Sequence, residues 1–199
     1  MLIKFLALIV LLFLVPLEAA AIDCKRADSK VAKTICGSND LVALDARLNA
    51  VYQAALKHAD SPDRIRRAQR AWVKLAQEGC DSTRCLSVAY LNRIHELTQA
   101  MSPWCEKATR MLDGAWFRVG EAGFFEEFSV DREGSFDSWL HQRPEISGGT
   151  LTRSGCTIQI ASDSGELKIK WLLLDAQPAR ISVFDFDVAD VARYKRVAE

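Results

Sequence analysis

The amino-acid sequence predicts an α+β fold, in which a disulfide-linked antiparallel helical bundle precedes a small antiparallel β-barrel or sandwich. Residues 24–101 contain only two glycines and one proline, and their apolar residues recur at steps of three and four, the spacing of one helix face. From Gly114 onward, glycines separate short segments rich in aromatic and β-branched residues, a pattern typical of antiparallel strands. We therefore expect a helical domain over residues 22–102 and a β domain over residues 103–199.

The first 21 residues have the layout of a secretory signal peptide. Lys4 supplies a positive charge, residues 5–15 are apolar, and Ala19-Ala20-Ala21 offers small residues for cleavage. The apolar run is shorter than the roughly 20 residues that a membrane-spanning helix needs. A lipid anchor on Cys24 is not expected, because Ile22-Asp23 stands where a lipoprotein signal has a small residue. We expect residues 1–21 to be removed, leaving a periplasmic protein that does not span the membrane.

The helical domain is predicted to contain four helices joined by short turns. A short helix near residues 29–35 precedes a long one over residues 41–58. The next helix starts after Ser61, a typical N-cap, with Pro62 at its first position, and continues to Gly79. Apolar residues from 86 to 97 form the last stripe. Short turns between helices of this length indicate an antiparallel bundle.

The β domain is predicted to follow a short connecting helix over Trp104–Leu112. Alternation with period two and a turn signal every 8–12 residues favour a small barrel or sandwich. Ser147-Gly148-Gly149 is interpreted as a turn. The predicted strands are Trp116–Val119, Phe124–Val130, Phe136–Leu140, Cys156–Ile160, Leu167–Leu174, Ile181–Phe186 and Tyr194–Val197.

Six cysteines remain after removal of the first 21 residues, and an even number in an exported chain indicates disulfides. If the two long helices are antiparallel, Cys80 returns to the start of the first helix, so that Cys36–Cys80 is the expected pair. Cys24–Cys85 is then expected next, and Cys105–Cys156 follows by exclusion. Six cysteines allow about fifteen pairings, and the sequence does not decide among the rest.

Gln69-Arg70-Ala71-Trp72 raises the question of whether this helix carries a reactive site or a structural contact. Trp72 lies on the inward side of its helix, two turns before Cys80, and is predicted to pack in the core with Tyr52 and Tyr90. Arg70 is expected to pair with a carboxylate such as Asp45. We interpret the stretch as structural.

The spacing of these residues resembles the LprI-type lysozyme-inhibitor N-terminal domain over residues 23–100. The resemblance implies a small, helical, disulfide-bonded module of bacterial envelope proteins, with lysozyme as the implied partner. One position departs from the family pattern, because Ala76 stands where an arginine is usual. The matching residues are Asp23-Cys24, Ile35-Cys36, Leu44-Asp45, Tyr52, Gln69-Arg70-Ala71-Trp72, Cys80, Cys85-Leu86, Tyr90 and Arg93.

The sequence contains no motif for catalysis, phosphate binding or a cofactor. We therefore expect a protein that is not an enzyme and has no cofactor. His58, His95 and His141 lie apart from other ligand-type residues, and the two in predicted helices, His58 and His95, are interpreted as solvent-exposed. A zinc site built from Cys24, Cys36, Cys80 and Cys85 lacks the usual close spacings. Asp185 and Asp187 share one strand face, which a glycosidase could use, but a solvated face is the favoured interpretation.

Charge is balanced overall, which excludes a general nucleic-acid binder, but it is divided between the halves. Residues 22–102 have 13 lysines and arginines against 9 aspartates and glutamates, whereas residues 103–199 have 12 against 16. Six acids interleave with phenylalanines and are expected to form one outer patch if the rings point inward. Such a patch suits lysozyme or another cationic envelope protein, although acids can also merely keep a hairpin soluble. These candidate contacts are Glu121, Glu126, Glu127, Asp131, Glu133 and Asp137.

Two other functions remain open at this stage. A barrel with a cavity lined by Trp116, Phe128, Trp139 and Trp171 would indicate a module for a small apolar ligand or cell-wall fragment, with the helices as an envelope adaptor. A densely filled barrel would exclude it. The arginine-rich run over residues 64–70 is interpreted as a solvated helix face, with anionic lipid or cell-wall polymer as the alternative.

Overall fold

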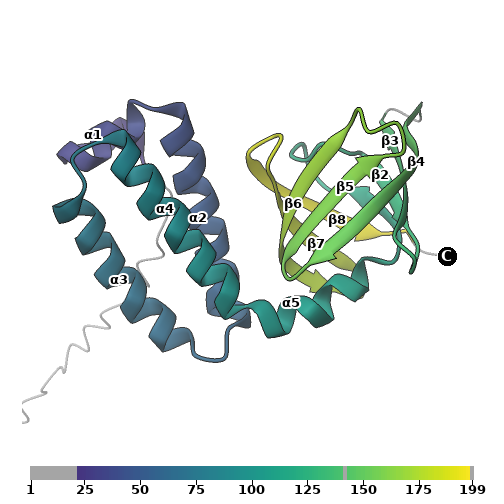
Figure 1. The fold of residues 1–199 in the computed structure, drawn as a ribbon, viewed down its shortest axis with the longest axis horizontal. Coiled ribbons are helices and arrows are strands. Elements are labelled where there is room, and N and C mark those ends of the chain that lie inside the picture. The colour runs from purple at the N-terminus through teal and green to yellow at the C-terminus, as the bar shows by residue number, and fades with distance from the viewer. Residues whose placement is uncertain (1–21, 141–142, 198–199) are drawn as a thin grey trace, which may run out of the picture.

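In the computed structural model, which describes residues 22–140 and 143–197, a helical bundle leads through a short helix into a closed β-barrel (Figure 1). The predicted α+β fold is confirmed, and the barrel is the form that the β domain takes. The signal peptide predicted over residues 1–21 lies outside the described residues. The helical elements are η1 (Cys24–Arg26), α1 (Lys30–Cys36), α2 (Asn39–His58), α3 (Pro62–Gly79), α4 (Thr83–Ala100), α5 (Ser102–Ala108) and η2 (Thr109–Leu112).

The helices begin where serine side chains accept hydrogen bonds from the first free backbone N–H groups. Ser29 caps α1, Ser38 caps α2 and Ser82 caps α4 in this way. Ser61 precedes α3 as predicted, but its side chain makes no capping hydrogen bond, and Pro62 starts the helix instead. Most apolar residues expected on the inner helix faces are buried or half-buried, although Leu75 of α3, also expected inside, is 69% exposed. Helices α2 and α4 run side by side through the bundle (Figure 1).

Eight strands in the described part of the chain pair antiparallel in sequence order, and β8 closes the barrel on β1. Each strand hydrogen-bonds its two neighbours in sequence, so the barrel is an up-and-down meander without a free sheet edge. The strands are β1 (Gly114–Arg118), β2 (Glu127–Val130), β3 (Ser135–Leu140), β4 (Arg143–Ser154), β5 (Thr157–Ser162), β6 (Lys168–Gln177), β7 (Arg180–Asp185) and β8 (Asp190–Arg196).

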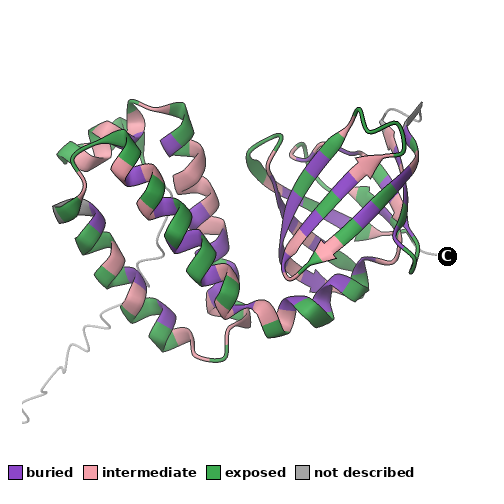
Figure 2. Ribbon diagram, in the orientation of Figure 1, coloured by how far each residue is buried: buried purple, intermediate pink, exposed green. Residues whose placement is uncertain are grey.

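The barrel interior is filled by aromatic side chains. Phe128 lies near the centre of the packing, with its ring centroid 5.0 Å from that of Tyr194, 5.3 Å from Trp171 and 5.5 Å from Phe136. All four side chains are buried, and buried and exposed residues alternate along the strands (Figure 2). Stacked and edge-on rings at these distances leave no room for a ligand among them.

One strand was missed because its glycines resemble a turn. Gly148 and Gly149 lie inside β4, next to the point where its register with β3 shifts. A Cβ at Gly149 would lie 2.8 Å from the carbonyl oxygen of Ala161 on β5, so only glycine allows the strands to approach there. The prediction of a turn at Ser147-Gly148-Gly149 is therefore wrong.

Two of the three predicted disulfide pairs are also wrong. The bundle contains Cys24–Cys36 and Cys80–Cys85, which close loops with sequence separations of 12 and 5 residues, in place of Cys36–Cys80 and Cys24–Cys85. Each bond joins neighbouring elements: η1 to the end of α1, and the end of α3 to the first turn of α4. Short loops bring their ends together at the smallest entropic cost, and Cys24 and Cys80 each pair with the cysteine that follows them in the chain.

The bundle and the barrel share a hydrophobic cluster. Leu172, Leu174 and Phe184 of the barrel are buried in the same cluster as Leu97 and Met101 at the end of α4. The disulfide Cys105–Cys156, the third predicted pair, joins α5 to the barrel. The predicted connector is present as α5 and η2. No helix among the described residues is both long and apolar enough for a bilayer.

Candidate functional site

A cavity of about 200 Å³ lies between the helices of the bundle. Residues of α1, α2, α3 and α4 line it together with Ile22. The cavity therefore collects residues that lie up to 68 positions apart in the chain. Seven residues of the sequence pattern that carries the family resemblance are among the lining residues: Ile35, Asp45, Tyr52, Gln69, Trp72, Leu86 and Tyr90.

Asp45 connects three parts of the bundle at this cavity. Its Oδ1 accepts a hydrogen bond of 2.7 Å from the Tyr90 hydroxyl on α4, and its Oδ2 accepts one of 2.7 Å from the backbone nitrogen of Ile22. Burial raises the pKa of Tyr90, and the negative charge of Asp45 and their hydrogen bond raise it further. The predicted pair between Arg70 and Asp45 is wrong, because Arg70 is exposed on α3 and Asp45 is held by these two donors.

Trp72 and Gln69 make contacts that join α3 to α4. The indole nitrogen of Trp72 donates to the carbonyl oxygen of Ala89 over 3.3 Å, and its ring meets Tyr90 edge-on. Gln69 is buried, and its Oε1 accepts a hydrogen bond of 2.9 Å from Nε of Arg93. Tyr52 and Tyr90 are buried, whereas Trp72 is half-buried. These contacts hold helices together, in line with the structural interpretation of this stretch.

The six candidate acidic residues, here called the acidic stripe, lie on β2, on β3 and in the loops at both ends of β2. Phe125, Phe128 and Phe136 are buried, so the neighbouring acids do point outward. Yet β2 has four residues and, at about 3.3 Å per residue, is roughly 13 Å long. Glu121 precedes β2 and Glu133 follows it, so these acids lie towards opposite ends of the strand.

Three of the six acids interact with their own chain. Asp131 accepts a hydrogen bond from the backbone of Ser135, and Asp137 accepts one from Gly148. Glu126 lies 3.8 Å from Arg118. Glu121, Glu127, Asp131 and Glu133 are exposed, whereas Glu126 and Asp137 are half-buried. The exposed carboxylates available to a partner are therefore fewer than the sequence suggested.

Asp185 and Asp187 do not form a catalytic pair. Asp185 is fully buried at the end of β7, where its carboxylate accepts hydrogen bonds from the backbone nitrogens of Phe124 and Asp187 and from the indole of Trp171. Asp187 is exposed in the following turn, where partial desolvation of its carboxyl group and the neighbouring charge of Asp185 raise its pKa. A carboxylate with three internal donors and no exposed surface cannot reach a substrate, so the glycosidase interpretation has no support in this geometry.

His58 was predicted to be solvent-exposed, and the structure contradicts this. Its side chain is 9% exposed at the end of α2 and stacks on Trp104 of α5 with ring centroids 3.6 Å apart. Its Nε2 lies 3.2 Å from Asp175 Oδ1 on β6, but the two atoms do not meet hydrogen-bond geometry. Burial lowers the pKa of His58, against the opposing charge of Asp175. The tertiary contact between bundle and barrel buries this helix end.

Among the residues that the structure describes, no group of three or more His, Cys, Asp or Glu side chains could hold a metal ion. His95 is exposed on α4, and His141 lies outside the described residues. Trp139 is half-buried and is absent from the barrel's hydrophobic cluster, whereas Trp116, Phe128 and Trp171 belong to it, so these four residues do not line a common cavity.

Residues 23–108 match a family model described as "Lysozyme inhibitor LprI", which confirms the resemblance predicted from the sequence. Proteins named "Lipoprotein LprI" from Mycobacterium bovis and from two strains of Mycobacterium tuberculosis are 32% identical to this chain over 89 residues. The chain spans about 44% of the length of each of these relatives, and the match covers 43% of the chain itself. No solved structure matches it. The matched region ends before the barrel, which begins at Gly114.

Proposed function

We propose that this chain is a non-catalytic binding protein of the periplasm that inhibits lysozyme or holds another cationic envelope protein. The observation that carries the proposal is the match of residues 23–108 to the lysozyme-inhibitor family, whose name describes an inhibitor rather than a catalyst. Three disulfides support an oxidising compartment outside the cytoplasm.

The acidic stripe of the barrel is the proposed contact for such a partner. Glu121, Glu127 and Glu133 expose their carboxylates along β2 and its flanking loops. A row of like charges accelerates association with an oppositely charged protein, and the effect weakens as salt rises. The family resemblance lies in the bundle, whereas the acidic stripe lies on the barrel. Under this proposal both halves of the chain would therefore contribute to inhibition.

A cell-wall turbidity assay with purified lysozyme tests the proposal. The mature protein is expected to slow lysis in proportion to its concentration, and less so at 0.5 M salt than at low salt because surface charges are then screened. No slowing at saturating protein would remove lysozyme as the partner. A pull-down from envelope extract would then test for another cationic protein.

The contact is tested by removing three charges together. The triple variant Glu121→Gln, Glu127→Gln, Glu133→Gln is expected to inhibit about tenfold more weakly, because each exposed pair contributes up to about 1 kcal/mol. The matched control Asp28→Asn, Glu106→Gln, Glu166→Gln removes the same charge from exposed positions elsewhere and is expected to inhibit normally. Equal losses in both variants would indicate net charge alone. Full inhibition by the stripe variant would place the contact on the bundle.

The packed barrel argues against the alternative of a ligand module. A ligand module would need a cavity lined by Trp116, Phe128 and Trp171, but these side chains fill the barrel axis together with Phe125 and Tyr194. A hydrophobic ligand would have to displace these rings. The barrel therefore more readily offers its outer surface than its interior to a partner.

A further inference from the structure

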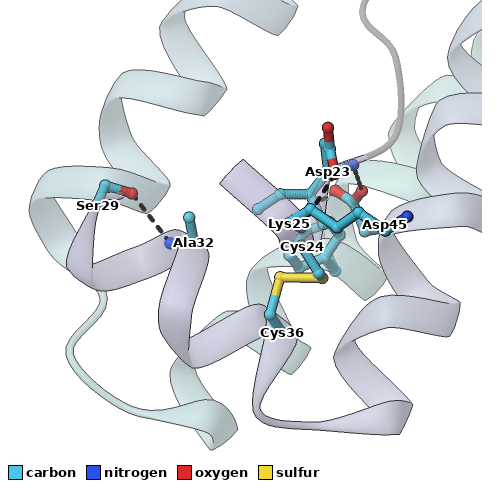
Figure 3. The surroundings of a disulfide bond; sticks show 9 residues. Asp23, Cys24, Lys25, Ser29, Ala32, Cys36 and Asp45 are labelled. Atoms are coloured by element: carbon cyan, nitrogen blue, oxygen red, sulfur yellow. Dashed lines mark hydrogen bonds between the residues drawn. A yellow bond between two sulfur atoms is a disulfide. The ribbon is translucent and has the colours of Figure 1, made fainter. Parts of the chain in front are cut away.

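The bundle holds the backbone nitrogen of Ile22 against a carboxylate. Ile22 N lies 2.7 Å from Asp45 Oδ2, across 23 positions of the chain. The Ile22 side chain is half-buried and packs against the hydrophobic cluster of the bundle. Figure 3 shows Asp45 of α2 beside this N-terminal segment, next to the Cys24–Cys36 disulfide. Ile22 also follows Ala19-Ala20-Ala21, the cleavage pattern of the predicted signal peptide.

We propose that hydrolysis of the Ala21–Ile22 bond on export creates an α-ammonium group at Ile22, which pairs with Asp45 and locks the N-terminal segment onto the bundle. A signal peptidase uses one water molecule to break this C–N bond. The Ala21 carbonyl carbon receives the hydroxyl oxygen and leaves as a carboxylate. The Ile22 nitrogen takes up the protons and becomes –NH₃⁺. A hydrogen bond from an uncharged amide to the carboxylate thereby becomes an ion pair between opposite charges, which is the stronger interaction.

A second acceptor in the same cavity suits an ammonium better than an amide. Asn49 lies one helical turn after Asp45 on the same face of α2, and both line the cavity with Ile22. Its Oδ1 is buried without a hydrogen-bond partner among the described residues. A backbone amide has one N–H, which Ile22 already donates to Asp45, whereas an ammonium has three N–H donors. An ammonium at Ile22 would keep two further donors beside the one that Asp45 accepts, in a cavity where no described residue donates to Asn49 Oδ1.

The neighbouring disulfide bears on where cleavage falls. The relatives are named as lipoproteins, and a lipid anchor would need the thiol of a cysteine at the new N-terminus. Cys24 has its sulfur bonded to Cys36, so it has no thiol to accept a lipid. Its bond also holds η1 close to α1, which places Ile22 beside α2. The N-terminus at Ile22 therefore fits the folded bundle, whereas one at a lipidated Cys24 does not.

Thermal unfolding of four full-length mature proteins tests the ion pair. The chain begins either at Ile22 or at Ala20, so that Ile22 carries an ammonium or an amide nitrogen, and each form is made with and without Asp45→Asn. The extension is expected to lower Tm by about 2–5 °C when Asp45 is present and to have no effect in the variant. Equal effects of Asp45→Asn in both forms would overturn the proposal. Asp28→Asn, an exposed acid nearby, is the matched control and should lower neither form selectively.

Two further measurements keep the test decisive if Asp45→Asn does not fold. Mass spectrometry of the exported protein should find Ile22 as first residue, and any other start, including an acylated Cys24, would overturn the proposal. The α-amine of the wild-type protein should also react at least tenfold more slowly with an acylating reagent than the same amine in a peptide of residues 22–30. Equal rates would show an undocked N-terminus. Neither result depends on lysozyme, so the two proposals fail separately.

Discussion

The effect of replacing Asp185 can be predicted most quantitatively, because its side chain is fully buried and its three hydrogen-bond donors are known. The side chain is 0% exposed. Oδ2 accepts from Phe124 N at 2.9 Å and from Trp171 Nε1 at 3.0 Å, and Oδ1 accepts from Asp187 N at 3.0 Å. The carboxylate thereby ties the β1–β2 loop and the β7–β8 turn to the aromatic core. It serves stability rather than chemistry.

Replacing Asp185 by alanine removes all three acceptors. Trp171 is also 0% exposed, so its indole N–H cannot find water, and an unsatisfied buried donor costs about 1–3 kcal/mol. The other two donors belong to half-buried or exposed residues, and each lost bond costs about 1 kcal/mol after water replaces it. The sum is about 3–5 kcal/mol. Asp185→Asn keeps one oxygen for the two donors at Oδ2 but turns an N–H₂ towards Asp187 N, so an intermediate loss is expected.

Urea unfolding at pH 7 measures this loss, with near-UV circular dichroism reporting the barrel aromatics and far-UV circular dichroism reporting the helices. Asp187→Asn is the matched control. It lies on the same turn but is exposed, and asparagine retains an acceptor, so a change within about 0.5 kcal/mol is expected. The reasoning is refuted if Asp185→Ala unfolds within about 1 kcal/mol of the wild type.

Three other predictions follow from the same structure. The pKa of His58 is lowered below its ordinary 6.5 by burial, so its contribution to stability is full above pH 6.5 and is lost as pH falls from there towards the folded-state pKa. Tm should therefore drop on acidification from pH 7.5 to 5.5, and less in His58→Gln. Removing the Cys105–Cys156 bond with alanines should cost about 4 kcal/mol in urea unfolding, since it closes a separation of 51 residues. Gly134→Ala should cost about 1–3 kcal/mol, because φ is +90° and the new Cβ would lie 2.6 Å from the Leu151 carbonyl oxygen.

Each of these has a control within the chain. His95→Gln changes an exposed histidine and should leave the slope of Tm with pH unaltered. Alanines at Cys80 and Cys85 open a separation of only 5 residues and should cost about 2 kcal/mol. Gly165→Ala has a similar φ of +74° but nothing within 4 Å of the new Cβ, so its cost should be smaller than that of Gly134→Ala. A reversed order in any of these pairs would contradict the stated cause.

Local sequence patterns predicted most helices and strands, but they did not predict which distant residues these elements contact. Period and capping placed the long helices, because a helix satisfies its hydrogen bonds within one segment. The sequence did not predict β4, because Gly148 and Gly149 are typical of a turn. These glycines are explained only by the close approach of the neighbouring strands β3 and β5. The cysteines were recognised as disulfide-forming, yet two of three pairs were misassigned, because pairing depends on which ends meet in space.

The candidate sites show the same division. The aromatic residues Tyr52, Trp72 and Tyr90 were expected in the bundle core, but their convergence with Asp45 and Ile22 on one cavity was not predicted. His58 was judged by its neighbours in sequence, whereas its environment is set by Trp104 and Asp175. The sequence did mark Ile22 as the residue that follows the predicted cleavage position. It did not indicate that Ile22 contacts Asp45.

The amino-acid sequence by itself determined the succession of helices, most of the strands and the resemblance of the bundle to a known family. These properties rest on spacing and turn chemistry, which act over a few residues. Only the tertiary structure decided that the sheet closes with a filled interior, that three of the six candidate acidic residues interact with their own chain, and that Asp45 accepts a hydrogen bond from Ile22. Those outcomes depend on contacts between distant segments, whose free energies appear only once hydrophobic burial has brought the segments together.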